Sequence, residues 1–398
     1  MVQLSRSARF YIAVLVLVLA GGTLPARAFA QEIKLTPAQR ARAHGELPLT
    51  NFYDTAVPLP AGKPGELIRA QPFDNYDLPD GVSAIRILYH STSATGQDVV
   101  SSGVVLIPGG SAPKGGWPVV AWAHPFIAVA RQCAPSLMRG LGSGSALSMY
   151  VNLGYAVVAT DYTGLGTAFR NAAFDVQSNA TDVINAVLAG RKAVPQLSTK
   201  WIAIGEGNGG ASALAAAELD SGDAGYLGSI SISGALDLKA ATEPSASAPW
   251  QDSLAYFVYG IKTVYPALRL EELLAPKGLA RCEAVTEACS PPALKSPLSH
   301  AETLKSDWLQ SKFVQDFLQR NALGLRPAHA PLLIISPQDP KNSSDAQVVS
   351  HMCGQKDRVD FMTYPGVDPN ELIGTTVATQ MAWIKARFEG RMTQNTCR

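Results

Sequence analysis

"IAIGEGNGGASAL", residues 202–214, is an apolar run that stops at a cluster of glycines and continues as an alanine-rich helix pattern. A strand that turns directly into a helix is the repeating unit of parallel α/β sheets. Several glycines in such a turn mark positions that need a positive φ or a close approach of two backbones. The predicted fold and the predicted function both depend on how this turn is interpreted.

The glycine turn has two interpretations. Gly205, Gly207 and Gly210 match G-x-G-x-x-G, which holds the pyrophosphate of a dinucleotide at a helix N-terminus. Gly205, Gly207 and Gly209 instead match G-x-S-x-G, the strand-to-helix turn of serine hydrolases, with glycine in place of the serine. The first pattern is weak by itself, and a Rossmann unit normally begins its domain, whereas this turn follows at least two buried strands.

The sequence around this turn alternates between strand and helix patterns. The predicted strands are residues 83–92, 99–108, 117–125, 155–166, 200–204, 228–234, 330–340 and 357–366, and the predicted helices are residues 145–154, 175–194, 209–219 and 375–390. "SATGQD" joins the first two strands as a hairpin turn. The alternation predicts a mostly parallel sheet covered by helices on both faces.

The first thirty residues are typical of a secretory signal peptide. Arg6 and Arg9 precede the apolar stretch "FYIAVLVLVLAGG", and Ala28-Phe29-Ala30 offers a cleavage site after Ala30. The apolar stretch is too short to span a bilayer comfortably. We therefore expect an exported protein, periplasmic or extracellular, that does not insert stably into a membrane.

Composition limits the remaining possibilities. The chain has 398 residues, of which 47% are hydrophobic and 16% charged, and its formal net charge is +1. This length suits one large α/β domain with an insertion. We divide it into a signal peptide (1–30), a core (31–238), a helical cap or lid (239–326) and the end of the core (327–398). A net charge near zero gives no electrostatic basis for a nucleic-acid partner.

Export makes disulfide bonds plausible for the five cysteines, Cys133, Cys282, Cys289, Cys353 and Cys397. Cys353 and Cys397 are placed to tie the C-terminal tail to the last core elements. Cys282 could pair with Cys289, or Cys133 could bridge to either of them, and the sequence does not choose. His351 and Cys353 have the spacing of a metal-site fragment, but two ligands without partners are weak, and we predict no metal site.

Several stretches together resemble the secretory lipase family of α/β-hydrolases. They are "ILYHSTSATGQDVVSSGVVLIP", "VVAWAHPFIAVARQCAPS", "LGYAVVATDYTGLGT", "GEGNGG" and "YPGVD", within a region running from about Phe52 to the C-terminus. The resemblance implies an α/β-hydrolase core with a lid and no cofactor. It also implies a catalytic serine on the strand-to-helix turn, a histidine, an acid, and backbone N–H groups that stabilise the oxyanion.

The sequence departs from the family where the chemistry takes place. The nucleophile position is Gly207, and the histidine expected after "YPGVD" is Pro369. Only the acid position survives, as Asp339 in "SPQDP". The oxyanion-hole region would comprise His124, Pro125, Phe126 and Asn208. There the family usually has His-Gly, whereas this chain has His-Pro, and proline has no N–H to donate.

These losses predict that hydrolysis by the family mechanism is absent, because removing a triad member costs several orders of magnitude in rate. We expect a binding or interaction protein whose cleft accepts a small apolar or ester-like ligand. The first alternative is an ester hydrolase using other groups, such as His124 or a serine of the cap. The second is dinucleotide binding through Gly205, Gly207 and Gly210. For Asn208 a helix-capping role is favoured, for Glu206 a solvated one, and for His124 a structural one.

Overall fold

The computed structural model describes residues 45–219, 222–234, 236–243, 248–289, 297–338, 343–392 and 394–397, which all belong to the unit formed by residues 42–398. The predicted signal peptide and Asp339 lie outside the described residues. In the part of the chain that is described, no helix has the length and apolar character needed to cross a membrane.

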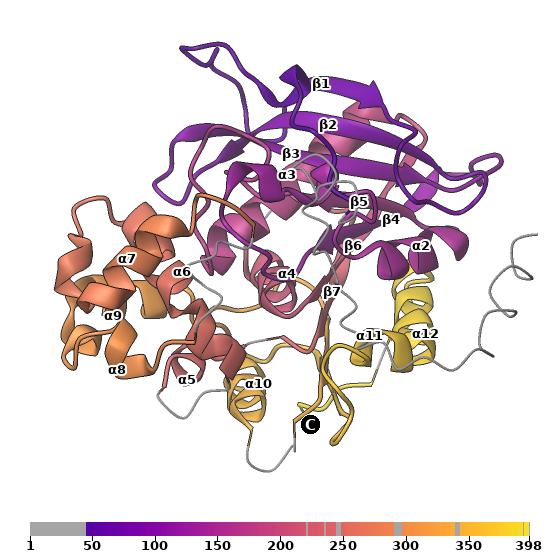
Figure 1. The fold of residues 1–398 in the computed structure, drawn as a ribbon. Coiled ribbons are helices and arrows are strands. Elements are labelled where there is room, and N and C mark those ends of the chain that lie inside the picture. The colour runs from indigo at the N-terminus through magenta and orange to yellow at the C-terminus, as the bar shows by residue number, and fades with distance from the viewer. Residues whose placement is uncertain are drawn as a thin grey trace, which may run out of the picture. The chain divides into compact units, whose positions relative to one another are not determined.

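Nine strands of the described residues form one sheet in the order β1-β2-β3-β5-β4-β6-β7-β8-β9 (Figure 1). They are β1 (Leu67–Pro72), β2 (Ser83–Thr92), β3 (Asp98–Ile107), β4 (Trp117–Ala123), β5 (Ala156–Thr160), β6 (Leu197–Glu206), β7 (Tyr226–Ile232), β8 (Leu332–Ser336) and β9 (Val359–Thr363). From β5 to β9 every neighbouring pair is parallel, and β1, β2 and β3 add an antiparallel end. The predicted parallel sheet and hairpin are confirmed, but the edge strand β1 was not predicted.

The helices of eight or more residues are α2 (Gly144–Asn152), α3 (Val176–Ala193), α4 (Asn208–Glu218), α6 (Ala248–Val264), α7 (Pro276–Ala284), α9 (Lys312–Arg320), α10 (Ser344–Gly354) and α12 (Val377–Phe388). The shorter helices are α5 (Leu238–Ala241), α8 (His300–Thr303) and α11 (Leu372–Thr375). The helix predicted over 375–390 is present as α12, which begins at Val377 after the short helix α11. The sequence analysis missed α10.

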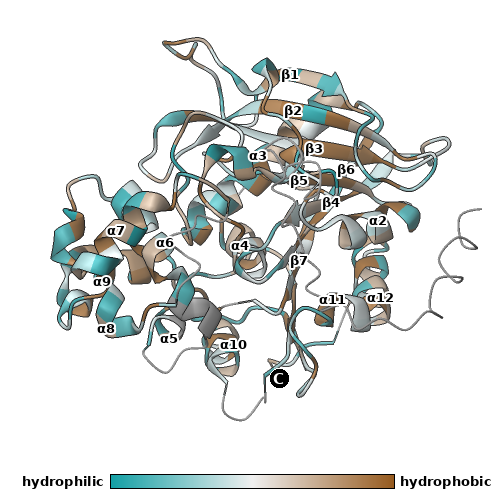
Figure 2. Ribbon diagram, viewed as in Figure 1, coloured by the Kyte–Doolittle hydropathy of each residue, from teal (hydrophilic) through white to brown (hydrophobic). Residues whose placement is uncertain are grey.

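Both faces of the sheet are apolar, so helices cover both. On β4, Trp122 packs with residues of α2 and α12, whereas its neighbour Ala121 packs with residues of α3 on the opposite face. Figure 2 shows hydrophobic residues along the central strands, between the helices of the two faces. This two-sided burial explains why the central strands read as continuous apolar runs rather than as alternating ones.

The helices between β7 and β8 have a hydrophobic core of their own. Phe257 of α6 is fully buried, and its ring meets Trp308 and Phe317 edge-on, with centroids 6.2 and 5.4 Å apart. These helices, α5 to α9, gather beside the sheet in Figure 1. The sequence predicted a largely helical insertion over residues 239–326, and its role as a lid stays a prediction.

Two disulfide bonds link segments that are distant in the sequence. Cys353 pairs with Cys397, as predicted, with the two Cα atoms 5.0 Å apart. Of the alternatives left open for the other three cysteines, the structure has Cys133 paired with Cys289, across 156 residues. Cys282 is a buried free thiol, and burial raises its pKa to about 12. The 133–289 bond therefore ties the loop after β4 to the segment after α7.

The C-terminal tail covers the exposed edge of β9. The backbone N–H of Thr396 donates to the carbonyl of Val359 at 2.7 Å, and the N–H of Phe361 donates to Oγ1 of Thr396 at 2.9 Å. Unpaired edge strands offer a template for aggregation, so a pinned tail protects this one. The disulfide at Cys397 holds the tail in place.

We expect the double substitution Cys353→Ser/Cys397→Ser to lower the free energy of unfolding by about 2–4 kcal/mol. The amides of Val359 and Phe361 should then exchange with deuterium faster, since their strand loses its cover. Cys282→Ser, which breaks no disulfide, is the control. Unchanged exchange at the β9 amides would show that the tail does not need its bond.

Candidate functional site

The glycine turn forms a sharp strand-to-helix elbow. β6 ends at Glu206, α4 begins at Asn208, and Gly207 lies between them with φ 55° and ψ −126°. The N–H of Gly207 donates to the carbonyl of Ile232 at 3.0 Å, which fixes the elbow to the end of β7. A positive φ of this size is costly for residues with a side chain and free for glycine.

The other glycines of the turn are required by packing. A Cβ on Gly205 would lie 2.1 Å from the carbonyl oxygen of Gly209, and one on Gly209 would lie 2.0 Å from that of Ala123. At Gly207 the nearest atom to such a Cβ is that of Pro125, at an ordinary 3.6 Å. Close helix–strand packing therefore explains the glycines that surround Gly207, and space remains for a side chain at position 207.

The elbow stands at the point where the sheet order reverses. After β4 the chain forms β5 on one side of it and then crosses back to form β6 on the other, and Gly205 pairs with Ala123. His124 and Pro125 follow Ala123 directly, so they lie beside the elbow. Ligands of open α/β sheets bind at such a switch point, outside the carboxyl ends of the strands.

Asn208 does not cap the helix, and that prediction is wrong. The N-cap residue is Gly207, and Asn208 is the first helical residue and is 9% exposed. The first N–H groups of a helix have no acceptor within the helix, so that of Asn208 is available to a negative oxygen. Pro125 on the facing loop supplies no second donor. The region predicted as the oxyanion hole therefore has one backbone donor, that of Asn208.

His124 is a buried residue held by backbone groups. It is 2% exposed, with Nδ1 2.7 Å from the carbonyl oxygen of Pro125 and Nε2 3.2 Å from that of Asp161. Burial lowers its pKa to about 4, against two hydrogen bonds that raise it. The hydroxyl of Tyr162 donates to the carbonyl of His124 at 3.1 Å. A neutral imidazole has one N–H, so it donates to only one of the two carbonyls. Burial between these backbone groups fits the structural role that the sequence favoured.

Aromatic rings close the space above the elbow. Phe126 stacks on Phe174 with centroids 4.5 Å apart, and Tyr256 of α6 meets Phe126 at 5.0 Å. The cavity that remains between Phe126, Phe174 and Asn208 has a volume of about 10 Å³. This is about the space of one water molecule, so any larger ligand requires the rings to move.

Glu206 ends β6 and Pro369 follows β9, so both lie toward the carboxyl end of the parallel strands. Glu206 is half-buried, and burial raises the pKa of its carboxyl, so it is not the solvated residue that was favoured. Pro369 is exposed on the turn between β9 and α11. The sequence analysis missed Asp345, a buried acid that accepts a hydrogen bond from Ser336 at 2.6 Å and whose pKa burial raises to about 6.

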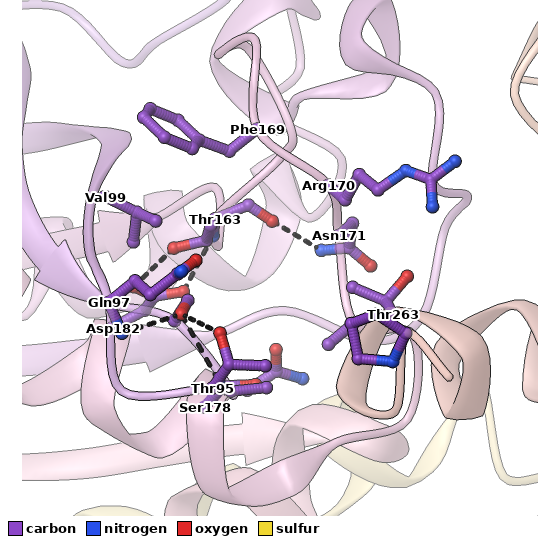
Figure 3. Close-up of a pocket in the computed structure, with 15 residues that line it drawn as sticks. Thr95, Gln97, Val99, Thr163, Phe169, Arg170, Asn171, Ser178, Asp182 and Thr263 are labelled. Atoms are coloured by element: carbon purple, nitrogen blue, oxygen red, sulfur yellow. Dashed lines mark hydrogen bonds between the residues drawn. The ribbon is translucent and has the colours of Figure 1, made fainter. Parts of the chain in front are cut away.

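A larger cavity, of about 240 Å³, lies between the β2–β3 hairpin and the start of α3 (Figure 3). Asp182 forms part of its wall and is 1% exposed. Its carboxylate accepts hydrogen bonds from the hydroxyl of Ser91 at 2.5 Å and from the backbone N–H of Thr163 at 2.7 Å. Asp182 of α3 thus joins β2 and the loop after β5 to its own helix. Figure 3 shows the Arg170 guanidinium extending away from the other labelled side chains.

Burial raises the pKa of Asp182 from 3.8 to about 6, so folding favours its protonated form. The stability it contributes is present below about pH 4 and is lost as the pH rises through 6. Asp182→Asn carries no charge at any pH. We expect its free energy of unfolding, relative to the parent, to improve by up to about 3 kcal/mol between pH 4 and pH 7. Urea unfolding at both pH values measures this, with the exposed Asp74→Asn as control; a constant difference would contradict it.

The fold of this chain was compared with those of solved structures. Lipase A of Candida antarctica, in its closed state, matches with a TM-score of 0.74 and 18% identity, covering 88% of this chain and 89% of that one. The rice cell wall degrading esterase LipA of Xanthomonas oryzae matches with a TM-score of 0.65 and 20% identity, covering 82% of this chain and 98% of that one. At these identities the likeness shows the α/β-hydrolase fold that the sequence predicted.

No curated protein matches the chain in sequence. Residues 145–396, by contrast, match the family described as secretory lipase. The matched region includes the elbow, the helices between β7 and β8, and the last two strands. The chain therefore belongs to the secretory lipase family.

Proposed function

We propose that this secretory lipase family protein lacks serine-hydrolase activity and binds a small apolar or ester-like ligand at its elbow. The observation that carries the proposal is Gly207, which keeps the positive φ of the elbow and offers no hydroxyl. Pro369 at the predicted histidine position and Pro125 at the predicted oxyanion position support it. Asp339 would be the retained acid of a triad that has lost its other two members.

We also propose that the protein is secreted. Membership of the secretory lipase family and two disulfides favour a secreted protein, because disulfides persist in oxidising compartments. We propose that residues 1–30 are the signal peptide and that cleavage follows Ala30.

The first test is for chemistry. A fluorophosphonate probe should leave the protein unlabelled, and a short-chain chromogenic ester should be turned over no faster than in buffer. Labelling of a defined serine, with turnover abolished when that serine is replaced, would establish the alternative of an active ester hydrolase. The contacts of His124 argue against that histidine as the base.

The second test is for binding. The same ester should bind without being consumed, and Gly207→Leu should weaken its affinity at least about tenfold by filling the elbow. Gly374→Leu is the control, because a Cβ there meets no atom within 4 Å. Since the cavity holds about one water, binding requires the stack of Phe126 on Phe174 to open. Equal affinity in both variants would place the ligand elsewhere.

Dinucleotide binding remains a weaker candidate. Packing accounts for Gly205 and Gly210, because a Cβ would lie 2.1 Å from the carbonyl oxygen of Gly209 in the first case and 2.6 Å from Oγ of Ser231 in the second. Gly207 is explained by its positive φ, so none of the three glycines needs a phosphate to explain it. A calorimetric titration with NAD and FAD should show no heat of binding.

A further inference from the structure

Asp182 is a buried acid that the proposed function does not use. It is 1% exposed and forms part of the wall of the cavity of about 240 Å³ between the β2–β3 hairpin and the start of α3. Its carboxylate accepts hydrogen bonds from the Ser91 hydroxyl and from the N–H and hydroxyl of Thr163, at 2.5, 2.7 and 3.0 Å. These donors are neutral, and within the described ranges no basic side chain forms an ion pair with Asp182. A buried carboxylate without a cation is costly, so a cationic ligand in the cavity would stabilise it.

The wall of the cavity does not supply that cation. Among the described residues that line the cavity, Arg170 is the one with a permanent positive charge. Its guanidinium lies 5.8 Å from the ring centroid of Tyr259, and Figure 3 shows it extending away from the other labelled side chains. Burial raises the pKa of Asp182 to about 6, and only hydrogen bonds from Ser91 and Thr163 oppose the rise. The carboxylate is therefore ionised in most molecules at pH 7, without a compensating charge.

Two buried asparagines place unused acceptors beside this carboxylate. Asn171 and Asn179 are each 5% exposed and line the cavity. Nδ2 of Asn171 donates to the carbonyl of Thr163 at 2.9 Å, so hydrogen bonds join Asn171 through Thr163 to Asp182 (Figure 3). Asn179 stands three residues before Asp182 on α3, and its Nδ2 donates to Oγ of Ser212 at 3.4 Å.

The amide oxygens of the two asparagines are available to a ligand. In the described part of the chain neither Oδ1 accepts a hydrogen bond, and neither is sealed off from the cavities that these residues line. An N–H donor placed between them would therefore gain two hydrogen bonds close to a negative charge. Such bonds are strengthened when the donor is itself charged.

The rest of the wall carries no charge apart from Arg170. Its apolar residues are Ala94, Val99, Phe169, Ala172 and Pro266, and its remaining polar residues have hydroxyl or amide side chains. The volume is below the range of about 300–1,000 Å³ that is usual for drug-sized ligands, so the cavity suits a smaller molecule. Apolar residues around a single carboxylate favour an organic cation over a hydrated metal ion.

We propose that this cavity binds a small primary alkylammonium ion. Its nitrogen donates hydrogen bonds to Oδ1 of Asn171 and Oδ1 of Asn179, and its charge neutralises Asp182. A primary ammonium has three N–H donors, which is enough for both oxygens. Its short alkyl chain lies against the apolar residues of the wall. The site is separate from the elbow, although Asn171 and Asn179 also line the small cavity there.

Calorimetric titration with butylammonium tests this, beside 1-butanol and butyrate, which have the same chain length but are neutral and negative. Butylammonium should bind with a dissociation constant on the order of 1 mM, which a ligand of this size can reach. The alcohol and the carboxylate should each bind at least about tenfold more weakly, because neither supplies the positive charge.

Asp182→Asn should weaken butylammonium binding at least about tenfold. The hydroxyls of Ser91 and Thr163 can turn to accept from the new amide, and the cost of burying a charge disappears, so this variant should fold. Asp74→Asn, which removes one exposed carboxylate, is the matched control and should leave the affinity unchanged. Ala94→Phe, which fills the cavity from the hairpin turn and keeps every charge, should also weaken binding at least about tenfold.

The inference is overturned if butylammonium does not bind, if 1-butanol or butyrate binds as tightly, or if Asp182→Asn binds like the parent. If Asp182→Asn does not fold, Ala94→Phe carries the same test, and an affinity equal to that of the parent overturns the inference. None of these outcomes decides whether an ester binds at the elbow, which Gly207→Leu tests separately.

Discussion

The double variant Gly207→Ser/Pro369→His should hydrolyse a short-chain chromogenic ester about 10³-fold faster than the parent protein. Removing a whole catalytic triad costs about 10⁶ in rate, and lacking one oxyanion donor costs about 10²–10³. The elbow has space for the new hydroxyl, because the nearest atom to a Cβ at Gly207 is 3.6 Å away. Restoring the triad without the second donor should therefore recover part of the rate.

The single variants are the matched controls. Gly207→Ser alone should remain inactive, since it lacks a base, and it should be about 1–2 kcal/mol less stable because serine must adopt the positive φ. Pro369→His alone lacks a nucleophile. Adding Pro125→Gly to the double variant restores a backbone N–H beside the elbow and should raise the rate further. If neither the double nor the triple variant gains activity, positions 207 and 369 do not form one site and the proposal loses its basis.

Replacing Arg86 by methionine should cost about 3–5 kcal/mol of the free energy of unfolding, because it removes the cation of a buried polar network. Arg86 is 2% exposed and donates to the hydroxyl of Tyr76 at 2.8 Å and to the carbonyl of Ser136 at 2.9 Å. Its guanidinium lies 3.4 Å from the ring centroid of Phe73. Beside it, Asp161 accepts hydrogen bonds from Ser136 and from the hydroxyl of Ser102.

The pH dependence of that loss identifies its cause. Burial raises the pKa of Asp161, and Arg86 is one of the groups that oppose the rise. Without Arg86 the carboxylate is more strongly penalised, so the deficit should be larger at pH 7 than at pH 4. Denaturant unfolding followed by tryptophan fluorescence measures it. Arg69→Met, on the exposed edge strand β1, is the control. A deficit below about 1 kcal/mol that does not change with pH would contradict a charged network.

The same network explains why the segment around Ser136 has its conformation. This segment carries Cys133. Arg86 of β2 and Asp161, which follows β5, both form hydrogen bonds with it. None of these contacts joins residues near in sequence. The motif "QCAPS" was quoted as part of the family resemblance, but its physical role is visible only when β2, the loop after β4 and the end of β5 are brought together.

Local sequence patterns determined much of the fold. Apolar runs and β-branched residues indicate that the segment containing them is buried. The parallel strands, the β2–β3 hairpin and the central helices could therefore be predicted from them. The elbow could be predicted because its four glycines lie within six consecutive residues, 205–210. The bond between Cys353 and Cys397 could be anticipated because both residues lie near the chain end. The order of the family motifs along the chain led to the prediction that Gly207 and Pro369 occupy the nucleophile and histidine positions.

Tertiary packing decided the rest. The pairing of Cys133 with Cys289 depends on a contact across 156 residues, which no local pattern encodes. Burial, not residue type, gave His124 a pKa of about 4 and Glu206 a raised one. The closing of the elbow by Phe126, Phe174 and Tyr256 needs two loops and a helix to meet. Sequence therefore predicted which catalytic groups are missing, whereas the surroundings of each remaining group follow from segments that only the folded chain brings together.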